Sequence, residues 1–78
     1  MANGNRLKKR SFSIAGHRTS VALEPEFWAA LQEEAREKKL ALAALVARVD
    51  AKRADRNLAS ALRVHVLRTA LEKAAHGP

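Results

Sequence analysis

The stretch "RTSVAL", residues 18–23, alternates in character from one residue to the next and is followed at once by Glu24 and Pro25. A period of two is typical of a half-buried β-strand, and proline fits the first position of a helix, where its missing N–H costs nothing. The chain therefore has one well-marked short strand ahead of a largely helical remainder. Because a single strand leaves its backbone N–H and C=O groups without partners, we expect a second copy of the chain to pair with it.

A second alternating run precedes this strand. In "SFSI", residues 11–14, Phe12 and Ile14 fall at even positions, whereas the apolar residues of 18–23 fall at odd ones. In one unbroken strand the two sets would face opposite sides, so the strand must be interrupted between them. Gly16 can adopt a positive φ and is the natural place for a bulge or turn. The pattern leaves open whether 11–14 folds back as a second strand or packs elsewhere.

Three helices are expected after the strand, at about residues 25–38, 43–52 and 58–73. In the first two, apolar residues recur at the spacing of a buried helical face. Asn57 is a good N-cap for the third, whose apolar positions go almost all the way round. Such a helix needs cover on more than one side, which favours a dimer in so small a chain.

Positive charge is concentrated near the N-terminus. The formal net charge is +7, and residues 1–23 contain five basic residues and no acidic one. Residues 1–10 are expected to form a flexible basic arm ahead of a domain at 11–74, with a C-terminal tail at 75–78. This distribution favours a polyanionic partner, either nucleic acid or an anionic membrane surface, although a solvated tail would also explain it.

The chain has 78 residues and no cysteine, so a single small domain must be stabilised without disulfides or a thiolate-bound metal. Oligomerisation is the remaining remedy. The N-terminal residues do not resemble a signal peptide, and no apolar run approaches the roughly 20 residues that span a bilayer. We therefore expect a cytoplasmic, nucleoid-associated protein that makes no membrane contact.

Several residues that could carry chemistry have plainer interpretations. His17, His65 and His76 share no i, i+4 spacing, so no metal site is expected, and His65 is expected to pack at an interface. Phe27 and Trp28 lie on the apolar stripe of the first helix, which favours core packing over a stacking platform for single-stranded nucleic acid. Because no nucleophile and base are suitably arranged and no glycine-rich phosphate loop is present, neither an enzyme nor a cofactor is expected.

The stretch "RTSVALEPEFWAALQEEAREKKLALAALVARVD" resembles the ribbon-helix-helix family, DNA-binding regulators of the Arc and MetJ type. The strings "KRSFSIAGHRTSVALEPEFW" and "RNLASALRVHVL" are similar to a subgroup of small members with a third helix, and together the resemblance covers most of residues 9–67. It implies a mostly α fold with one short β-strand, in an intertwined homodimer with an intermolecular antiparallel β-ribbon and an additional C-terminal helix. The dimer core is expected to contain Val21, Leu23, Trp28, Leu31, Leu45, Val46, Val49, Leu58 and Leu62.

In this family alternate residues of the ribbon touch base edges, which implies base readout by Arg18, Ser20 and Ala22. The Arg18 guanidinium can donate two hydrogen bonds to O6 and N7 of guanine. Ser20 can donate to or accept from several bases. Ala22 stands where a polar residue is expected, and it offers only apolar contact with a thymine methyl group.

The resemblance also implies a phosphate clamp at the start of the second helix, where free backbone N–H groups and the helix dipole hold the DNA backbone. Lys39 sits where such turns commonly use glycine, and Lys38 and Lys39 add positive charge there. Basic residues just upstream of the ribbon are expected to follow phosphates or enter a groove. The residues expected to contact phosphate are Lys8, Lys9, Arg10, His17, Ala43 and Ala44.

Two functions follow from these expectations. The first is a sequence-specific double-stranded DNA-binding transcriptional regulator, a repressor, that inserts a dimeric β-ribbon into the major groove and is free to assemble further on DNA. The alternative is a protein-interaction or antitoxin-like dimer, whose third helix binds another protein and whose DNA binding is weak or non-specific. The operator, the regulated genes and any effector are not encoded in these patterns.

Overall fold

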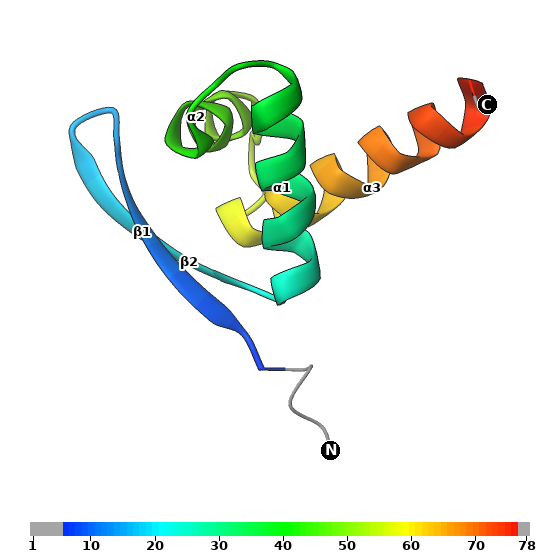
Figure 1. Ribbon diagram of the computed structural model, residues 1–78. Coiled ribbons are helices and arrows are strands. Elements are labelled where there is room, and N and C mark those ends of the chain that lie inside the picture. Colours follow the sequence, from blue (N-terminus) through cyan, green and yellow to red (C-terminus); the bar gives the residue numbers. More distant parts are fainter. Residues whose placement is uncertain (1–5, 77–78) are drawn as a thin grey trace.

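The computed structural model describes residues 6–76, which form a β-hairpin followed by three helices (Figure 1). This succession confirms the fold class expected from the sequence, with a second strand added to the one that the sequence marks clearly. The elements are β1 (Lys8–Ile14), β2 (His17–Leu23), α1 (Pro25–Glu37), α2 (Leu42–Lys52) and α3 (Leu58–His76).

β1 and β2 pair antiparallel within one chain, from Ile14 opposite His17 to Lys8 opposite Leu23. The loop between them consists of Ala15 and Gly16, whose φ angles are 53° and 81°. Two consecutive positive φ values are the requirement of a type I′ turn, whose twist suits a tight hairpin. Residues 11–14 therefore do fold back as a second strand, and one edge of β2 is already paired without a second copy of the chain.

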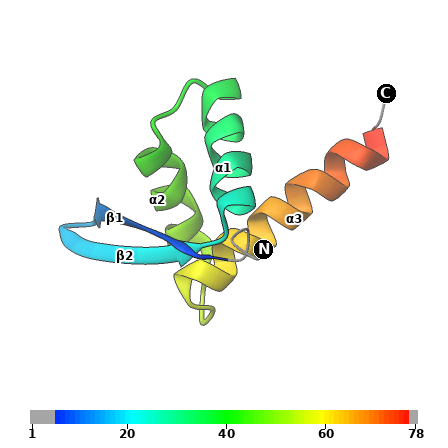
Figure 2. The same cartoon turned by 60° about the horizontal axis from the view of Figure 1, so that its bottom comes forward.

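The hairpin register explains the change of parity between the two alternating runs. With a two-residue loop, each even position of β1 lies opposite an odd position of β2, and residues directly opposite one another share a face. Phe12 and Ile14 therefore face the same side as Val21 and Leu23. That side packs against the helices, and Figure 2 shows α1 and α2 lying over the hairpin.

The prediction that residues 1–10 form a flexible basic arm is wrong for the last three of them. Lys8, Lys9 and Arg10 belong to β1, because they find backbone partners in β2 and an anchor on α1. The Trp28 Nε1–H of α1 donates a hydrogen bond of 2.8 Å to the Lys8 carbonyl oxygen. Residues 1–5 of the expected arm lie outside the described residues.

Local sequence signals account for the helix ends. Pro25 opens α1, and its C-terminus is closed by Lys39 at φ 59°, with the Leu40 N–H donating to the Ala35 carbonyl over 2.8 Å. This is a Schellman closure, and it places lysine in a left-handed position that usually belongs to glycine. At α3, the Asn57 side chain accepts a 2.8 Å hydrogen bond from the Ser60 N–H, as its expected N-cap role requires.

α3 has a packed first part and a projecting second part. Leu58 and Leu62 are buried against the other elements, whereas Leu67 and Leu71 are 56% and 60% exposed. The helix continues three residues past its expected end, to His76, and extends away from the rest of the molecule (Figure 1). None of the three described helices combines the length and apolar character that crossing a membrane requires.

Candidate nucleic-acid interface

The outer face of the hairpin, on the side away from the helices, is polar and basic. Its cross-strand pairs are Lys9 with Ala22, Ser11 with Ser20, and Ser13 with Arg18. All of these side chains are exposed except Ala22, which is half-buried. The hydroxyls of Ser11 and Ser20 are 2.9 Å apart and share a hydrogen bond. We call these six residues the ribbon face.

The three residues expected to read bases all lie on the ribbon face. Arg18 and Ser20 project from β2 without burial, and Ala22 continues the same line toward α1. The structure adds Lys9, Ser11 and Ser13 from β1, which the sequence interpretation did not assign to base contact. The signal that could have located them is the Ala15-Gly16 pair: a tight turn there fixes the register and hence the face of every β1 residue.

The other basic residues of the hairpin point toward the helical side. The Arg10 guanidinium carbon lies 5.4 Å from the centre of the Trp28 ring, and Phe12 packs against the same ring with centroids 5.9 Å apart. An arginine over an indole face is a cation–π contact, so Arg10 has a structural role within the chain. Lys8 and His17 lie on the same side of the hairpin and are exposed. The structure thus does not bring Lys8, Arg10 and His17 onto the ribbon face.

Of the two alanines expected to hold phosphate at the start of α2, only Ala43 has a backbone N–H without an acceptor among the described residues. α2 begins at Leu42 with Ala41 as its N-cap, and no side chain caps it. The Ala44 N–H donates to the Ala41 carbonyl over 3.0 Å, so it is engaged within the helix. Ala43, at the second helical position, belongs to the first turn, whose N–H groups are left without intrahelical acceptors. Both alanines are exposed, and neither belongs to the ribbon face.

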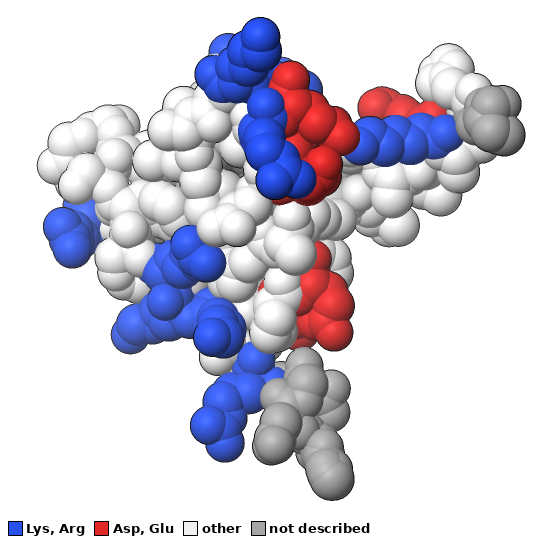
Figure 3. Space-filling model, in the orientation of Figure 1, with Lys and Arg blue, Asp and Glu red and all other residues white. Residues whose placement is uncertain are grey.

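Charge is distributed unevenly over the surface. Figure 3 shows basic side chains following the hairpin, while acidic side chains on the same view lie over α1 and α3. No acidic residue occurs before Glu24, so the hairpin presents positive charge alone. An exposed basic ribbon with hydroxyl groups between its cations has the positive charge and the hydrogen-bonding groups of a surface that binds nucleic acid.

A family model described as the ribbon-helix-helix domain matches residues 7–70. The chain belongs to the ribbon-helix-helix family. This family is one of DNA-binding regulators, is typically non-enzymatic, and generally binds DNA as dimers. Comparison with curated proteins gives no match, and neither does comparison with solved structures.

The residues expected to form the core of a ribbon-helix-helix dimer are all buried within the single chain. Their exposed fractions run from 0% for Leu23, Leu31, Val46 and Leu62 to 8% for Leu58. They pack together in one cluster with Ile14, Ala35 and Ala61. One copy of the chain therefore covers these side chains, and a role for them between two copies stays a prediction.

Charged residues between α1 and α3 pair with one another, away from the ribbon face. Glu34 is 5% exposed and accepts hydrogen bonds from Lys38 Nζ at 2.7 Å and His65 Nε2 at 2.8 Å. Burial raises the pKa of Glu34, but these two hydrogen bonds and the nearby positive charges outweigh burial and bring its pKa below the ordinary value. His65 is therefore half-buried within one chain, and its partner is a buried carboxylate; packing of His65 at an interface stays a prediction.

Two further ion pairs join α3 to α1 and its N-cap. Arg63 Nε donates to Glu24 Oε1 over 3.0 Å. A hydrogen bond from the Glu24 backbone N–H to its own carboxylate, together with this contact, lowers the pKa of Glu24. Lys73 Nζ lies 3.2 Å from Glu37 Oε1 near the projecting part of α3. Three acidic residues of this ribbon-helix-helix protein, Glu24, Glu34 and Glu37, thus link α1 and its N-cap to α3.

Proposed function

We propose that this protein is a sequence-specific double-stranded DNA-binding regulator that acts as a homodimer and represses transcription by occupying its operator. The observation that carries the proposal is the ribbon face. It is exposed and basic, contains no acid, and belongs to the element with which strand-reading proteins enter the major groove. Membership of a family of DNA-binding regulators supports it.

The open edge of β2 suits pairing with a second copy. β1 occupies one edge of β2 in the described two-stranded sheet, so the other edge keeps backbone groups that an antiparallel β2 from a second chain would satisfy. This arrangement gives a four-stranded sheet with the two β2 strands at its centre. Three strand spacings make such a sheet about 14 Å wide, slightly more than the roughly 12 Å major groove.

This geometry divides the work on the ribbon face. The central β2 strands would reach base edges, so Arg18 and Ser20 carry the sequence readout and Ala22 contacts a thymine methyl group. The outer β1 strands would lie at the rim of the groove, where Lys9 meets phosphates and the hydroxyls of Ser11 and Ser13 are within reach of the backbone. Two-fold symmetry of the dimer then requires a two-fold related operator.

A selection from random duplex DNA tests this function directly. The wild-type protein is compared with Arg18→Ala and with Arg36→Ala, a control that removes the same charge from exposed α1, where Arg36 pairs with Glu33. We expect a two-fold motif from the wild type and the control, and a relaxed or shifted motif from Arg18→Ala. Equal binding to all duplexes by all three proteins would reject sequence readout by the ribbon face.

Repression needs a separate measurement. Transcription in vitro from a promoter that contains the selected motif should fall as protein is added, at the concentrations that occupy the motif. The same promoter with the motif scrambled should be unaffected. Unchanged or increased transcription at full occupancy would contradict a repressor and leave DNA recognition standing.

A second candidate is favoured by the exposed Leu67 and Leu71 of α3. Two leucines one helical turn apart, each more than half exposed, are typical of a surface that another protein covers. We compare the wild type with Leu67→Ser/Leu71→Ser by sedimentation equilibrium and DNA binding. An unchanged dimer with unchanged DNA affinity would favour a different protein as the partner of this helix, in an antitoxin-like role.

A further inference from the structure

We propose that the projecting part of α3 pairs antiparallel with the same helix of a second copy of the chain. Its two large apolar side chains, Leu67 and Leu71, are 56% and 60% exposed, so they are open to a partner. Figures 1 and 2 both show this part of α3 extending away from the hairpin. The contact is therefore separate from the proposed β2 pairing, and it does not require DNA binding.

The side of α3 away from the core carries an apolar stripe. Its members, which we call the outer stripe, are three, four and three positions apart along the helix: Val64, Leu67, Leu71 and Ala74. This alternation of three and four is the spacing of the residues that meet between paired helices in a coiled coil. At about 3.6 residues per turn the outer stripe lies opposite Leu58 and Leu62, which are buried in the core. α3 therefore has a second apolar face, whose two leucines stay more than half exposed.

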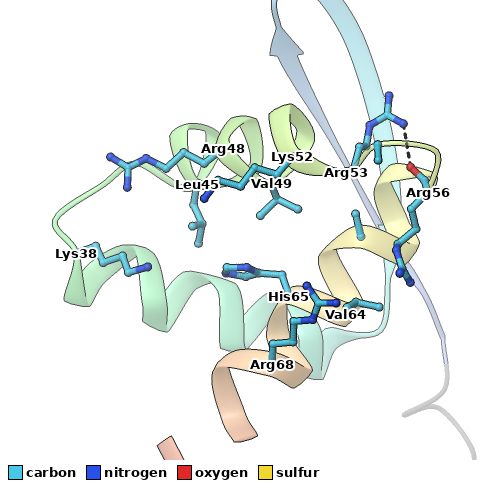
Figure 4. Close-up of a pocket in the computed structure, with 12 residues that line it drawn as sticks. Lys38, Leu45, Arg48, Val49, Lys52, Arg53, Arg56, Val64, His65 and Arg68 are labelled. Atoms are coloured by element: carbon cyan, nitrogen blue, oxygen red, sulfur yellow. Dashed lines mark hydrogen bonds between the residues drawn. The ribbon is translucent and has the colours of Figure 1, made fainter. Parts of the chain in front are cut away.

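Two charged residues beside the outer stripe are not paired within the described chain. Arg63 and Lys73 contact acidic residues of α1 and its N-cap. Arg68 and Glu72 are exposed and form no salt bridge among the described residues. They lie one helical turn apart, but an arginine that precedes its glutamate is the weaker order for a pair within a helix. Figure 4 shows Arg68 and the ring of His65 pointing in different directions from α3, so Arg68 takes no part in the buried contact of His65.

These two charges select the direction of the partner helix. An antiparallel pair places Leu67 opposite Leu71 of the partner subunit. Arg68 and Glu72 of the partner subunit then lie on the same flank, two residues apart along the axis, or about 3 Å at the helical rise. Two-fold symmetry repeats this contact, so the pair gains two salt bridges. In a parallel pair Arg68 would instead lie near Arg63 of the partner subunit, and repulsion between the two arginines disfavours that direction.

A second copy is favoured over a different protein because the outer stripe and its two charges complement themselves. A two-fold contact needs a surface that fits its own copy, and an apolar stripe flanked by one arginine and one glutamate meets that need. Because the proposed β2 pairing is also two-fold, a chain that makes both contacts joins dimers into tetramers or longer assemblies. The α3 contact alone would give a dimer, so it does not depend on the β2 pairing.

Sedimentation equilibrium of the full chain without DNA tests the contact. Leu67→Ser/Leu71→Ser removes the leucines of both copies from the interface and should weaken one association step by about a hundredfold or more. Leu7→Ser is the control, because Leu7 is also an exposed leucine, 47% exposed just before β1, and its loss should leave that step unchanged. Identical association of all three proteins at every concentration would reject a second copy as the partner of the outer stripe.

Charge reversals test the direction of the pair. Arg68→Glu and Glu72→Arg each place like charges across the antiparallel contact, and each should weaken the association step by about tenfold. An equimolar mixture of the two variants brings opposite charges together again and should associate like the wild type. A mixture that associates no more tightly than either variant alone would overturn the proposal, as would tighter association of Arg68→Glu by itself, which a parallel pair requires. These measurements contain no DNA, so a failure of the proposed DNA recognition would leave them untouched.

Discussion

Charged side chains have opposite surroundings in two regions of the molecule. Between α1 and α3, Glu34 accepts hydrogen bonds from Lys38 and His65, and Glu37 pairs with Lys73. On the ribbon face Lys9 and Arg18 stand among serines, and no acidic residue lies on that face. The difference separates charges that hold the fold together from charges that are available to a partner. Substitutions of the first kind should change stability, and those of the second kind should change binding.

The largest effect on stability is expected from Glu34→Gln. The substitution keeps the shape of the side chain but removes the charge that Lys38 and His65 face in a buried position. We expect a loss of about 2–3 kcal/mol in the free energy of unfolding, measured by urea denaturation at neutral pH. Glu33→Gln, which alters an exposed carboxylate paired with Arg36, is the matched control and should cost much less.

The hydrogen bonds of Glu34 with Lys38 and His65 also predict that stability falls at acid pH. Because the pKa of Glu34 is lower in the folded chain than in the unfolded one, the unfolded state binds more protons as the pH falls below the ordinary value of about 4.5. The contribution of Glu34 is therefore fully present above that pH and is lost as the pH drops through the folded pKa. Glu34→Gln should flatten this part of the stability profile, and an unchanged profile would contradict the role given to the pair.

Arg18→Ala should have the reverse pattern. Arg18 is exposed, and among the described residues its side chain makes no hydrogen bond or salt bridge, so the free energy of unfolding should stay within about 0.5 kcal/mol of the wild type. Affinity for the selected operator should fall by about 2 kcal/mol, because one bidentate contact to guanine is lost. Binding isotherms at fixed salt measure this change. A large loss of stability in this variant would place Arg18 with the structural charges.

Lys9→Ala sharpens the division within the ribbon face. If Lys9 meets phosphates at the rim, its loss should weaken binding severalfold for every duplex alike and leave the preferred sequence unchanged. The slope of log affinity against log salt should decrease in magnitude by about one for each phosphate contact removed. A changed sequence preference would instead place Lys9 on a base edge.

Much of the fold could be predicted because its signals are local. Pro25 after an acidic residue opens α1, Asn57 caps α3, and apolar spacing marks the buried faces of the first two helices. The hairpin was harder to predict from the sequence. Ala15 is an uncommon residue at a position with positive φ, whereas an asparagine before Gly16 would have indicated a type I′ turn. Once that turn is known, the change of parity fixes the register.

Some residues of the candidate site could likewise be predicted from local sequence, and others could not. Strand alternation predicts that Arg18, Ser20 and Ala22 share one face, and they do. Their role in base readout comes from the resemblance to the family and stays a prediction. Composition does not distinguish the roles of Lys8 and Arg10 from that of Lys9. The folded hairpin does, because it places the Arg10 guanidinium over the Trp28 ring and brings the Lys8 carbonyl to the Trp28 Nε1–H. The Glu34 and His65 pair joins residues 31 positions apart, and nothing local in the sequence signals such a contact.

The smallest effect is expected from Lys73→Gln, at the exposed end of the contact between α1 and α3. Lys73 and Glu37 are 60% and 49% exposed, so water competes for both charges and salt screens them. We expect a loss below about 0.5 kcal/mol in the free energy of unfolding, vanishing in molar salt, where the loss in Glu34→Gln should persist. Denaturation of both variants at low and high salt measures the contrast. A loss in Lys73→Gln as large and as salt-resistant as that in Glu34→Gln would mean that the projecting part of α3 is covered in solution, by a second copy or another protein, and that its charges belong with the buried ones.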